Sequence, residues 1–193
     1  MFEFDFIIFK AMRVFRLTLL ISFVFSSFFA IHSSAQDAVV PRPSPLAIVN
    51  ARYKSTYFKL TYSQPHKKGR QVFGGMIPFG EVWRTGANEA TEITVTRNIQ
   101  INGKLLLAGT YSLFTIPDEK KWTIIINAEP GLWGSYNYNK TLDVMRFDVP
   151  VQNVPGDLVY EAFTIQLDHK NEMANLLLLW DRTKISIPIK FLD

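Results

Sequence analysis

Hydrophobic and polar residues alternate with a period of two along most of the chain from residue 46 onward. This spacing is typical of strands that bury one face, and β-branched and aromatic residues are frequent in the same runs. No window of ten residues carries a convincing stripe with the 3.6-residue period of a helix. We therefore predict an all-β domain with strands at 46–53, 57–63, 91–97, 104–108, 111–116, 122–127, 142–149, 158–167, 175–180 and 184–190.

Turn-forming residues predict which of these strands pair. Asn102 and Gly103 are the preferred residues of a two-residue hairpin loop, because both tolerate positive φ. Residues 117–120 and 181–183 contain further turn formers between two strand patterns. We expect each of these three turns to join an antiparallel pair.

Pro188 lies inside the last predicted strand. Because proline has no N–H for the sheet, this strand is expected at a sheet edge. Short strands with hairpin connections predict an antiparallel β-sandwich of jelly-roll character, and an up-and-down β-barrel is the alternative.

The first 35 residues have a different pattern, with basic residues, an apolar run at 17–31 and small residues up to Ala35. This is the layout of a signal peptide that is cleaved after Ala35. A retained membrane anchor is the alternative, but a span needs about 20 apolar residues and this run is shorter and interrupted by Ser and Thr. The segment before Met12 is too hydrophobic and acidic for the start of a conventional signal, so we expect translation to start at Met12, with Met1 as the alternative.

Composition supports an exported protein. The chain is 48% hydrophobic, but nine of its 16 Phe lie in the first 35 residues. Residues 36–193 hold 18 of the 21 basic and 15 of the 17 acidic residues, a net charge of +3 that is too small and scattered for nucleic-acid binding. Cysteine is absent, so disulfides and the lipid anchor of a lipoprotein are excluded. We expect a periplasmic or secreted protein, without stable membrane insertion of the mature chain, that has a flexible Pro-rich lead-in at 36–45 and one domain at 46–193.

Two connections, at 66–90 and 129–140, fit neither strands nor short turns. Connections longer than about 12 residues are uncommon in compact domains and are often functional. The first contains Trp83, Arg84 and a nearby amide and carboxylate, Asn88 and Glu89, a mixture that could bind an anionic or sugar oxygen and stack on an apolar ring face. The alternative is that Arg84 pairs with Glu89 and that Asn88 caps the loop backbone.

The second connection alternates aromatic residues with small or polar ones at 133–138. This pattern suits a carbohydrate platform or a plug at one end of the sandwich, and the propensity of buried Tyr and Trp favours the plug. Trp122 and Trp180 fall on predicted strands and are expected in the core.

Catalytic chemistry has little support in the sequence. His66 and His169 have no carboxylate or His at metal-ligand spacing, so we expect no zinc site, no Ser–His triad and no cofactor. Several carboxylates could join Glu89 in a pair for glycoside cleavage, although solvated charges on strand faces explain them better; they are Asp143, Asp148 and Glu161.

Several runs resemble the bacterial exported family known as domain of unknown function 2911. The most specific is Trp-Arg-Thr-Gly-Ala-Asn-Glu-Ala-Thr at 83–91. Further similarity lies at 62–65, 69–75, 101–103, 108–117 and 122–125, and at Trp133-Gly134 with Tyr136 and Tyr138, and Asp143 with Arg146. The resemblance covers residues 46–193 and implies no activity, because none is established for the family.

The resemblance does imply a surface site, because its signature falls on long loops, where packing does not require Arg, Asn and Glu together. We expect the two loops to converge at one end of the sandwich. The candidate site residues are Arg70, Trp83, Arg84, Asn88, Glu89, Trp133 and Tyr136.

These observations favour a non-enzymatic binding or interaction module for a glycan or another polar small molecule. One alternative is a hydrolase-type enzyme that acts through Glu89 with Arg84 as its electrostatic partner. A second is a structural envelope domain whose motif locks its loops. The sequence predicts no oligomeric state.

Overall fold

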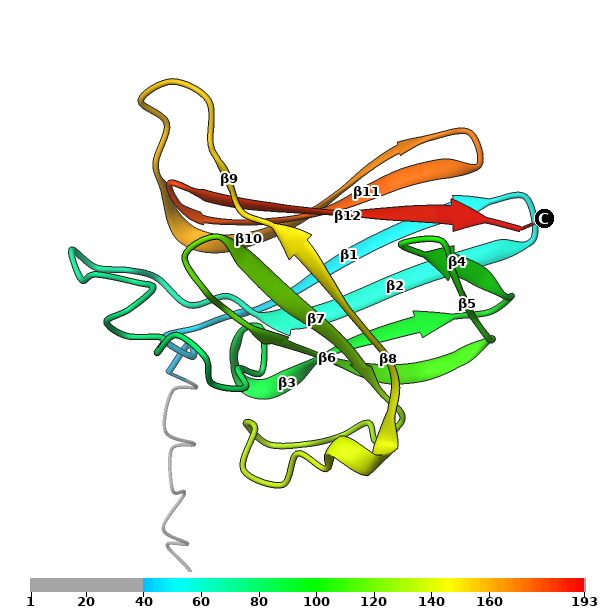
Figure 1. Ribbon diagram of the computed structural model, residues 1–193, viewed down its shortest axis with the longest axis horizontal. Helices are drawn as coiled ribbons and strands as arrows, with labels where there is room; N and C mark the ends of the chain where they lie inside the picture. The colour runs from blue at the N-terminus through cyan, green and yellow to red at the C-terminus, as the bar shows by residue number, and fades with distance from the viewer. Residues whose placement is uncertain (1–39, 193) are drawn as a thin grey trace, which may run out of the picture. The chain divides into compact units, whose positions relative to one another are not determined.

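The computed structural model describes residues 40–192, so the predictions for the signal peptide, its cleavage after Ala35 and the start at Met1 or Met12 lie outside the described residues. This part of the chain is almost entirely β (Figure 1). Its elements are β1 (Leu46–Tyr53), β2 (Thr56–Ser63), β3 (Ala87–Val95), β4 (Ile99–Ile101), β5 (Lys104–Leu106), β6 (Gly109–Ile116), β7 (Lys121–Asn127), the 3-10 helix η1 (Lys140–Leu142), β8 (Asp143–Pro150), β9 (Gln152–Asn153), β10 (Tyr160–Lys170), β11 (Met173–Asp181) and β12 (Thr183–Phe191).

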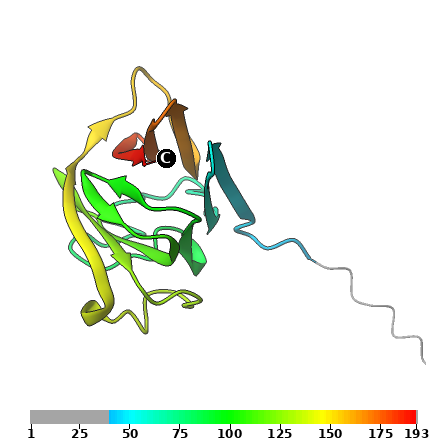
Figure 2. The same cartoon turned by 90° about the vertical axis from the view of Figure 1, so that its right-hand side faces the viewer.

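The strands form two antiparallel sheets that lie as two layers (Figures 1 and 2). The first has the order β1-β2-β3-β6-β7-β8, and the second has the order β10-β11-β12-β4-β5 with β9 also paired to β12. The sheets do not close on one another. The predicted β-sandwich is therefore confirmed, and the alternative of a β-barrel is wrong.

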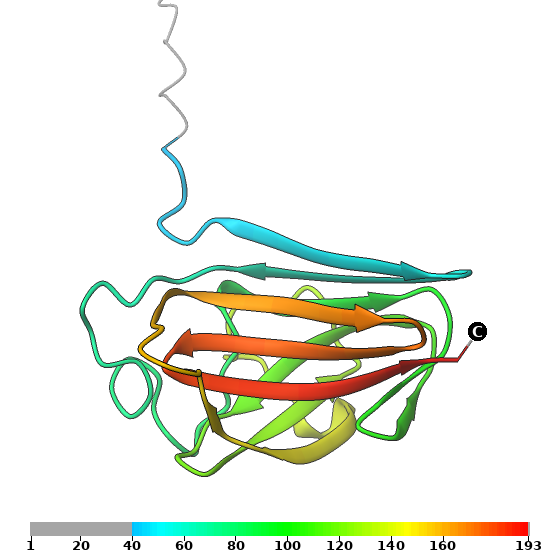
Figure 3. The same cartoon turned by 90° about the horizontal axis from the view of Figure 1, so that it is seen from above.

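The period-two pattern places the core between the sheets. In β2 the buried and half-buried positions alternate, and Phe58 and Leu60 are fully buried. They belong to one cluster with Phe163 of β10 and Ile185 of β12, from the opposite sheet. Figure 3 shows β10, β11 and β12 lying side by side as one layer of this sandwich.

The predicted hairpins are confirmed. Asn102 and Gly103 have φ of 50° and 73° and join β4 to β5, whose register is Ile101↔Lys104. The turns at 117–120 and 181–183 join β6 to β7 and β11 to β12, which are also antiparallel pairs. Local turn chemistry was thus sufficient to predict these contacts.

The expected edge position of the last strand is wrong, because β12 lies between β11 and β4. Its Pro188 accepts a hydrogen bond from the N–H of Asn102 at 2.8 Å. The N and O atoms of one residue in an antiparallel strand point to the same side, so the missing N–H faces that side as well. On that side of β12, its pairing with β9 ends at Lys184 and its pairing with β4 begins at Ile189. Proline is tolerated because this stretch of an interior strand has a local gap on one side.

No helix within residues 40–192 is long and apolar enough to cross a membrane.

Candidate functional site

The conspicuous run at 83–91 forms an irregular loop because it is too long for the strand beside it. Trp83 and Thr115 of β6 exchange backbone hydrogen bonds of 2.7 and 2.9 Å, and Thr91 pairs with Leu113 of the same strand. On β6 only Phe114 lies between Leu113 and Thr115. Between their partners Trp83 and Thr91, by contrast, lie the seven residues 84–90. These seven residues, which we call the 84–90 loop, therefore bulge away from β6, and the last four of them, at 87–90, form the start of β3.

Thr85 fixes the conformation of the 84–90 loop. It is fully buried and has a φ of 55°, which is strained for a β-branched residue by about 1–3 kcal/mol. Its carbonyl accepts from the hydroxyl of Thr91 at 2.6 Å, and its own hydroxyl donates to that of Thr115 at 3.1 Å. The N–H of Thr91 also donates to the carbonyl of Arg84 at 3.1 Å. These bonds to two neighbouring strands hold the backbone of Arg84 in place.

The second long connection, the 129–140 loop, pairs with the 84–90 loop. The N–H of Ala90 donates to the carbonyl of Leu132 at 2.9 Å, and the N–H of Gly134 donates to the carbonyl of Asn88 at 3.0 Å. Glu89 and Trp133 thereby form an antiparallel bridge. The two loops converge as predicted, and Figure 1 shows the 129–140 loop, in yellow-green, passing below β3.

A pocket of about 260 Å³ lies where the loops meet. Its polar lining includes Arg84, Glu81 and Ser135, and the last residue comes from the 129–140 loop. The Nε of Arg84 is buried without a hydrogen-bond partner. The remaining lining residues are Pro65, Met76, Ile77, Pro78, Val82, Trp83, Gly86, Ala87 and Trp180.

Trp83 borders this pocket, but its ring belongs to the core. Its side chain is only 5% exposed, and its Nε1 donates to the carbonyl of Gly86 at 3.0 Å. The ring stacks on Trp180 with centroids 5.8 Å apart and meets Phe163 edge-on at 5.0 Å. Both belong to the opposite sheet, so Trp83 joins the two layers. Trp122 and Trp180 are buried as predicted.

Glu89 does not pair with Arg84, so the alternative of an ion pair between them is wrong. The Oε1 of Glu89 accepts from Arg42 at 2.7 Å, and its Oε2 accepts from the hydroxyl of Ser63 at 3.2 Å. Burial raises the pKa of Glu89, but its own backbone N–H together with Arg42 and Ser63 outweighs this and holds that pKa below its usual value. The carboxylate is therefore ionised and satisfied.

Glu89 and Arg84 also line different cavities. Glu89 borders a second pocket of about 390 Å³, together with Lys59, Ser63 and Glu92. Arg84 is absent from the lining of that pocket, and Glu89 is absent from the lining of the first. The structure does not bring these two residues together as one reaction centre.

Two residues of the lead-in contact the 84–90 loop, a contact that sequence reasoning missed. Arg42 pairs with Glu89, and the side-chain amide of Asn88 donates to the carbonyl of Ser44 at 3.4 Å. Asn88 thus bonds the lead-in with its side chain and the 129–140 loop with its carbonyl. The only signal in the sequence was a cation in a proline-rich segment, which gives no indication of its partner.

The remaining basic candidate, Arg70, lies in its own turn. Its Nε donates to the carbonyl of Lys67 at 2.9 Å and its Nη2 to the carbonyl of His66 at 2.8 Å. Arg70 lines neither of the two pockets. Its guanidinium stabilises the start of the first long connection.

The favoured interpretation of the aromatic run as a plug is wrong for Trp133 and Tyr136, which are 58% and 82% exposed. A Cβ on Gly134 would lie only 2.7 Å from the Cε2 of Tyr136, and Gly134 has a φ of 69°. Glycine therefore lets the Tyr136 ring fold back over the loop. Tyr138 instead packs into the fold, with its ring 5.1 Å from that of Phe114.

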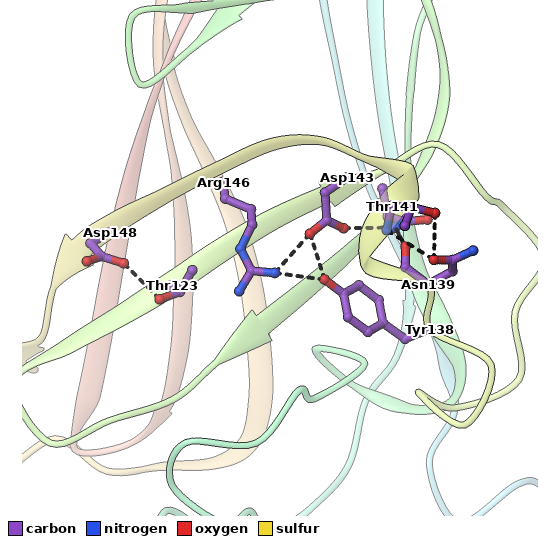
Figure 4. Close-up of polar contacts among 8 residues, drawn as sticks. Thr123, Tyr138, Asn139, Thr141, Asp143, Arg146 and Asp148 are labelled. Carbon is purple, nitrogen blue, oxygen red and sulfur yellow. Dashed lines mark hydrogen bonds and ion pairs between the residues drawn. The ribbon is translucent and has the colours of Figure 1, made fainter.

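A polar network anchors the end of the 129–140 loop (Figure 4). Asp143 accepts from Tyr138 at 2.6 Å and from Arg146 at 2.9 Å through Oδ2, and from Asn127 at 2.9 Å through Oδ1. Arg146 also donates to the hydroxyl of Tyr138 at 2.8 Å. Asn139 caps η1 with its side chain. The network holds the loop against β7 and β8.

The explanation of Asp143 as a solvated charge is wrong, because its side chain is only 6% exposed. Asp148 and Glu161 do fit that explanation. Asp148 lies on β8 with its side chain 45% exposed and bonds Lys121, and Glu161 is exposed and accepts from the backbone N–H of Lys68. The part of the chain that the structure describes contains no group of three or more His, Asp or Glu that could hold a metal ion.

Fold and site together define an all-β sandwich protein in which two paired loops border a small pocket with one unpaired arginine. A family model described as "Protein of unknown function (DUF2911)" matches residues 44–189. The chain belongs to this family, which confirms the resemblance. No curated protein and no solved structure matches the chain.

Proposed function

We propose that this protein is a non-enzymatic binding module for a glycan or another polar small molecule, bound where the 129–140 loop meets the Arg84 pocket. The observation that carries the proposal is the exposure of Trp133 and Tyr136 on a backbone paired to β3. Exposed aromatic rings on a fixed backbone offer contact area at little cost in conformational entropy. The apolar face of a sugar ring packs on such surfaces, while neighbouring polar groups bind its hydroxyls.

The alternatives have less support. The hydrolase alternative requires Glu89 and Arg84 to act together, but they line different pockets, and Glu89 is already bonded to Arg42 and Ser63. A purely structural role explains the paired loops. It does not explain why Trp133 is exposed two residues before Ser135, which lines the Arg84 pocket.

We also propose that the protein is exported to the periplasm or the medium after removal of residues 1–35. Basic residues, a short apolar run and a small-residue cleavage site support this. N-terminal sequencing of the protein recovered outside the cytoplasm should start at Gln36. A mature chain that retains residues 17–35 would contradict cleavage.

Trp133→Ala is expected to weaken glycan binding by about tenfold or more, because one aromatic contact contributes roughly 1–1.5 kcal/mol. Its free energy of unfolding should change by less than about 0.5 kcal/mol, since the side chain is mostly exposed. A thermal-shift screen of polysaccharide fragments finds the ligand, and titration calorimetry compares the variants. Leu105→Ala is the matched control, because Leu105 is also exposed but lies on β5. Equal binding by the two variants would overturn the proposed site.

A further inference from the structure

We infer that the group bound at Arg84 is a carboxylate, carried by an acidic sugar such as a uronate. The inference rests on the proposed function and specifies the ligand of that same site. It follows from the unpaired guanidinium, from the fixed backbone around it and from the composition of the pocket.

Arg84 has a donor that no acceptor in the described part of the chain uses. Its Nε is buried without a partner, and its guanidinium forms no ion pair or hydrogen bond within residues 40–192. By contrast, Arg42, Arg70 and Arg146 all donate to protein oxygens. A buried donor without an acceptor costs free energy, and guanidinium binds carboxylates through two parallel hydrogen bonds. An external carboxylate would supply the missing acceptor.

The backbone under Arg84 is fixed before any ligand arrives. Trp83 pairs with Thr115 on one side of Arg84, and the strained Thr85 is bonded to Thr91 on the other. Strained backbone held by its surroundings is typical of binding sites. A rigid site loses less conformational entropy on binding.

The size and charge of the pocket favour a carboxylate on a single ring. The volume of about 260 Å³ is below the roughly 300–1,000 Å³ of typical small-molecule pockets, so it suits one ring. Among residues 40–192, Arg84 is the only cation in its lining, and Glu81 is an anion in the same lining. One cation matches a monoanion, whereas Glu81 would repel the second charge of a phosphate. Neutral hydroxyls of a sugar could instead donate to Glu81.

Ser135 connects this pocket to the exposed aromatic residues. It lines the pocket and lies between Trp133 and Tyr136 in the chain. A uronate whose carboxylate binds Arg84 could therefore extend toward these rings. The apolar walls, including Ile77 and Val82, exclude water and strengthen the charged contact.

The test compares trigalacturonate with neutral galactotriose by titration calorimetry on the exported protein. Trigalacturonate should bind about tenfold or more tightly than galactotriose. Arg84→Gln should weaken trigalacturonate binding by about 10- to 100-fold and galactotriose binding far less, because only trigalacturonate loses a charged contact. Equal affinity for the two sugars in the wild type, or unchanged trigalacturonate binding by Arg84→Gln, would overturn the inference.

Two further variants separate a lost contact from a lost fold. Arg84→Lys keeps the charge without the two-pronged geometry and should bind trigalacturonate with intermediate affinity. Ser135→Tyr should block the pocket from the 129–140 loop, and near-ultraviolet circular dichroism should show a native core in all three variants. Trigalacturonate binding that survives Ser135→Tyr would place the carboxylate elsewhere and overturn the inference.

Additional probes distinguish this inference from the proposed function. Neutral sugars that bind in a Trp133-dependent way, without any preference for trigalacturonate, would overturn the inferred carboxylate ligand but support the proposed glycan-binding function. If glutarate binds through Arg84 while no sugar binds, the carboxylate-binding site at Arg84 is supported, but a glycan as its ligand is contradicted. Inorganic phosphate that displaces trigalacturonate at equal concentration would overturn the choice of carboxylate.

Discussion

Trp83→Ala is expected to lower the free energy of unfolding by about 3–5 kcal/mol, the range for a buried Trp replaced by Ala. The ring contacts Phe73, Trp122, Phe163 and Trp180 with centroids 5.0–6.1 Å apart, so its removal opens a cavity between the sheets. The carbonyl of Gly86 would also lose the Nε1 donor. Both effects act at the point where the two layers join.

Urea denaturation followed by circular dichroism measures this loss, and Trp133→Ala is the control. The two tryptophans lie in the two long connections but differ in exposure, 5% against 58%. Trp83→Phe should lose less than Trp83→Ala, because it keeps most of the ring contacts but not the hydrogen bond to Gly86. A loss below about 1 kcal/mol for Trp83→Ala would show that the ring does not support the core, and Trp83 would again be a candidate ligand contact.

The sequence predicted most of the fold because the determining signals are local. Alternation along β2 follows directly from burial of one face, and Asn102-Gly103 specifies a hairpin without distant contacts. Prediction failed where a distant partner decides the outcome. Pro188 is tolerated inside the sheet only because β9 and β4 leave a gap beside it.

The candidate site shows the same limit. An ion pair between Arg84 and Glu89 was one alternative, but the distant Arg42 binds Glu89 and leaves Arg84 facing its pocket. Trp83 and Trp133 both lie in long loops. Only the contacts of Trp83 with Phe163 and Trp180 on the opposite sheet determine which one is buried. Composition identified the residue types, but tertiary contacts assign their roles.

Asp143→Ala is expected to cost about 2–3 kcal/mol, less than the 3–5 kcal/mol of a fully buried pair because Arg146 is 31% exposed. The change removes the acceptor of Tyr138, Arg146 and Asn127 together. Asn127 is fully buried, so its side-chain NH2 group would keep only the carbonyl of Asn139 as an acceptor. We expect the 129–140 loop to loosen, and binding at Trp133 to weaken with it.

Urea denaturation measures this cost, and Asp148→Ala is the matched control on the same strand. Asp148 also accepts from a cation and a hydroxyl, Lys121 and Thr123, but this pair is exposed and should contribute little. Similar losses for the two variants would contradict the assignment of Asp143 as the anchor. Hydrogen exchange at residues 129–140 should increase only in Asp143→Ala.

The pH dependence gives an independent check on the same network. Burial, and then the hydrogen bond to Asp143, raises the pKa of Tyr138 to about 12. The pKa of Tyr138 in the folded state is above its value of about 10 in the unfolded chain. The protonated Tyr138 therefore contributes its full share to the free energy of unfolding below pH 10, and this share is lost as the pH rises toward 12. Without Asp143 the pKa rises less, so the stability difference between wild type and Asp143→Ala should be smaller at pH 11 than at pH 8. A difference that stays constant over this range would show that the Tyr138 hydroxyl is not coupled to Asp143.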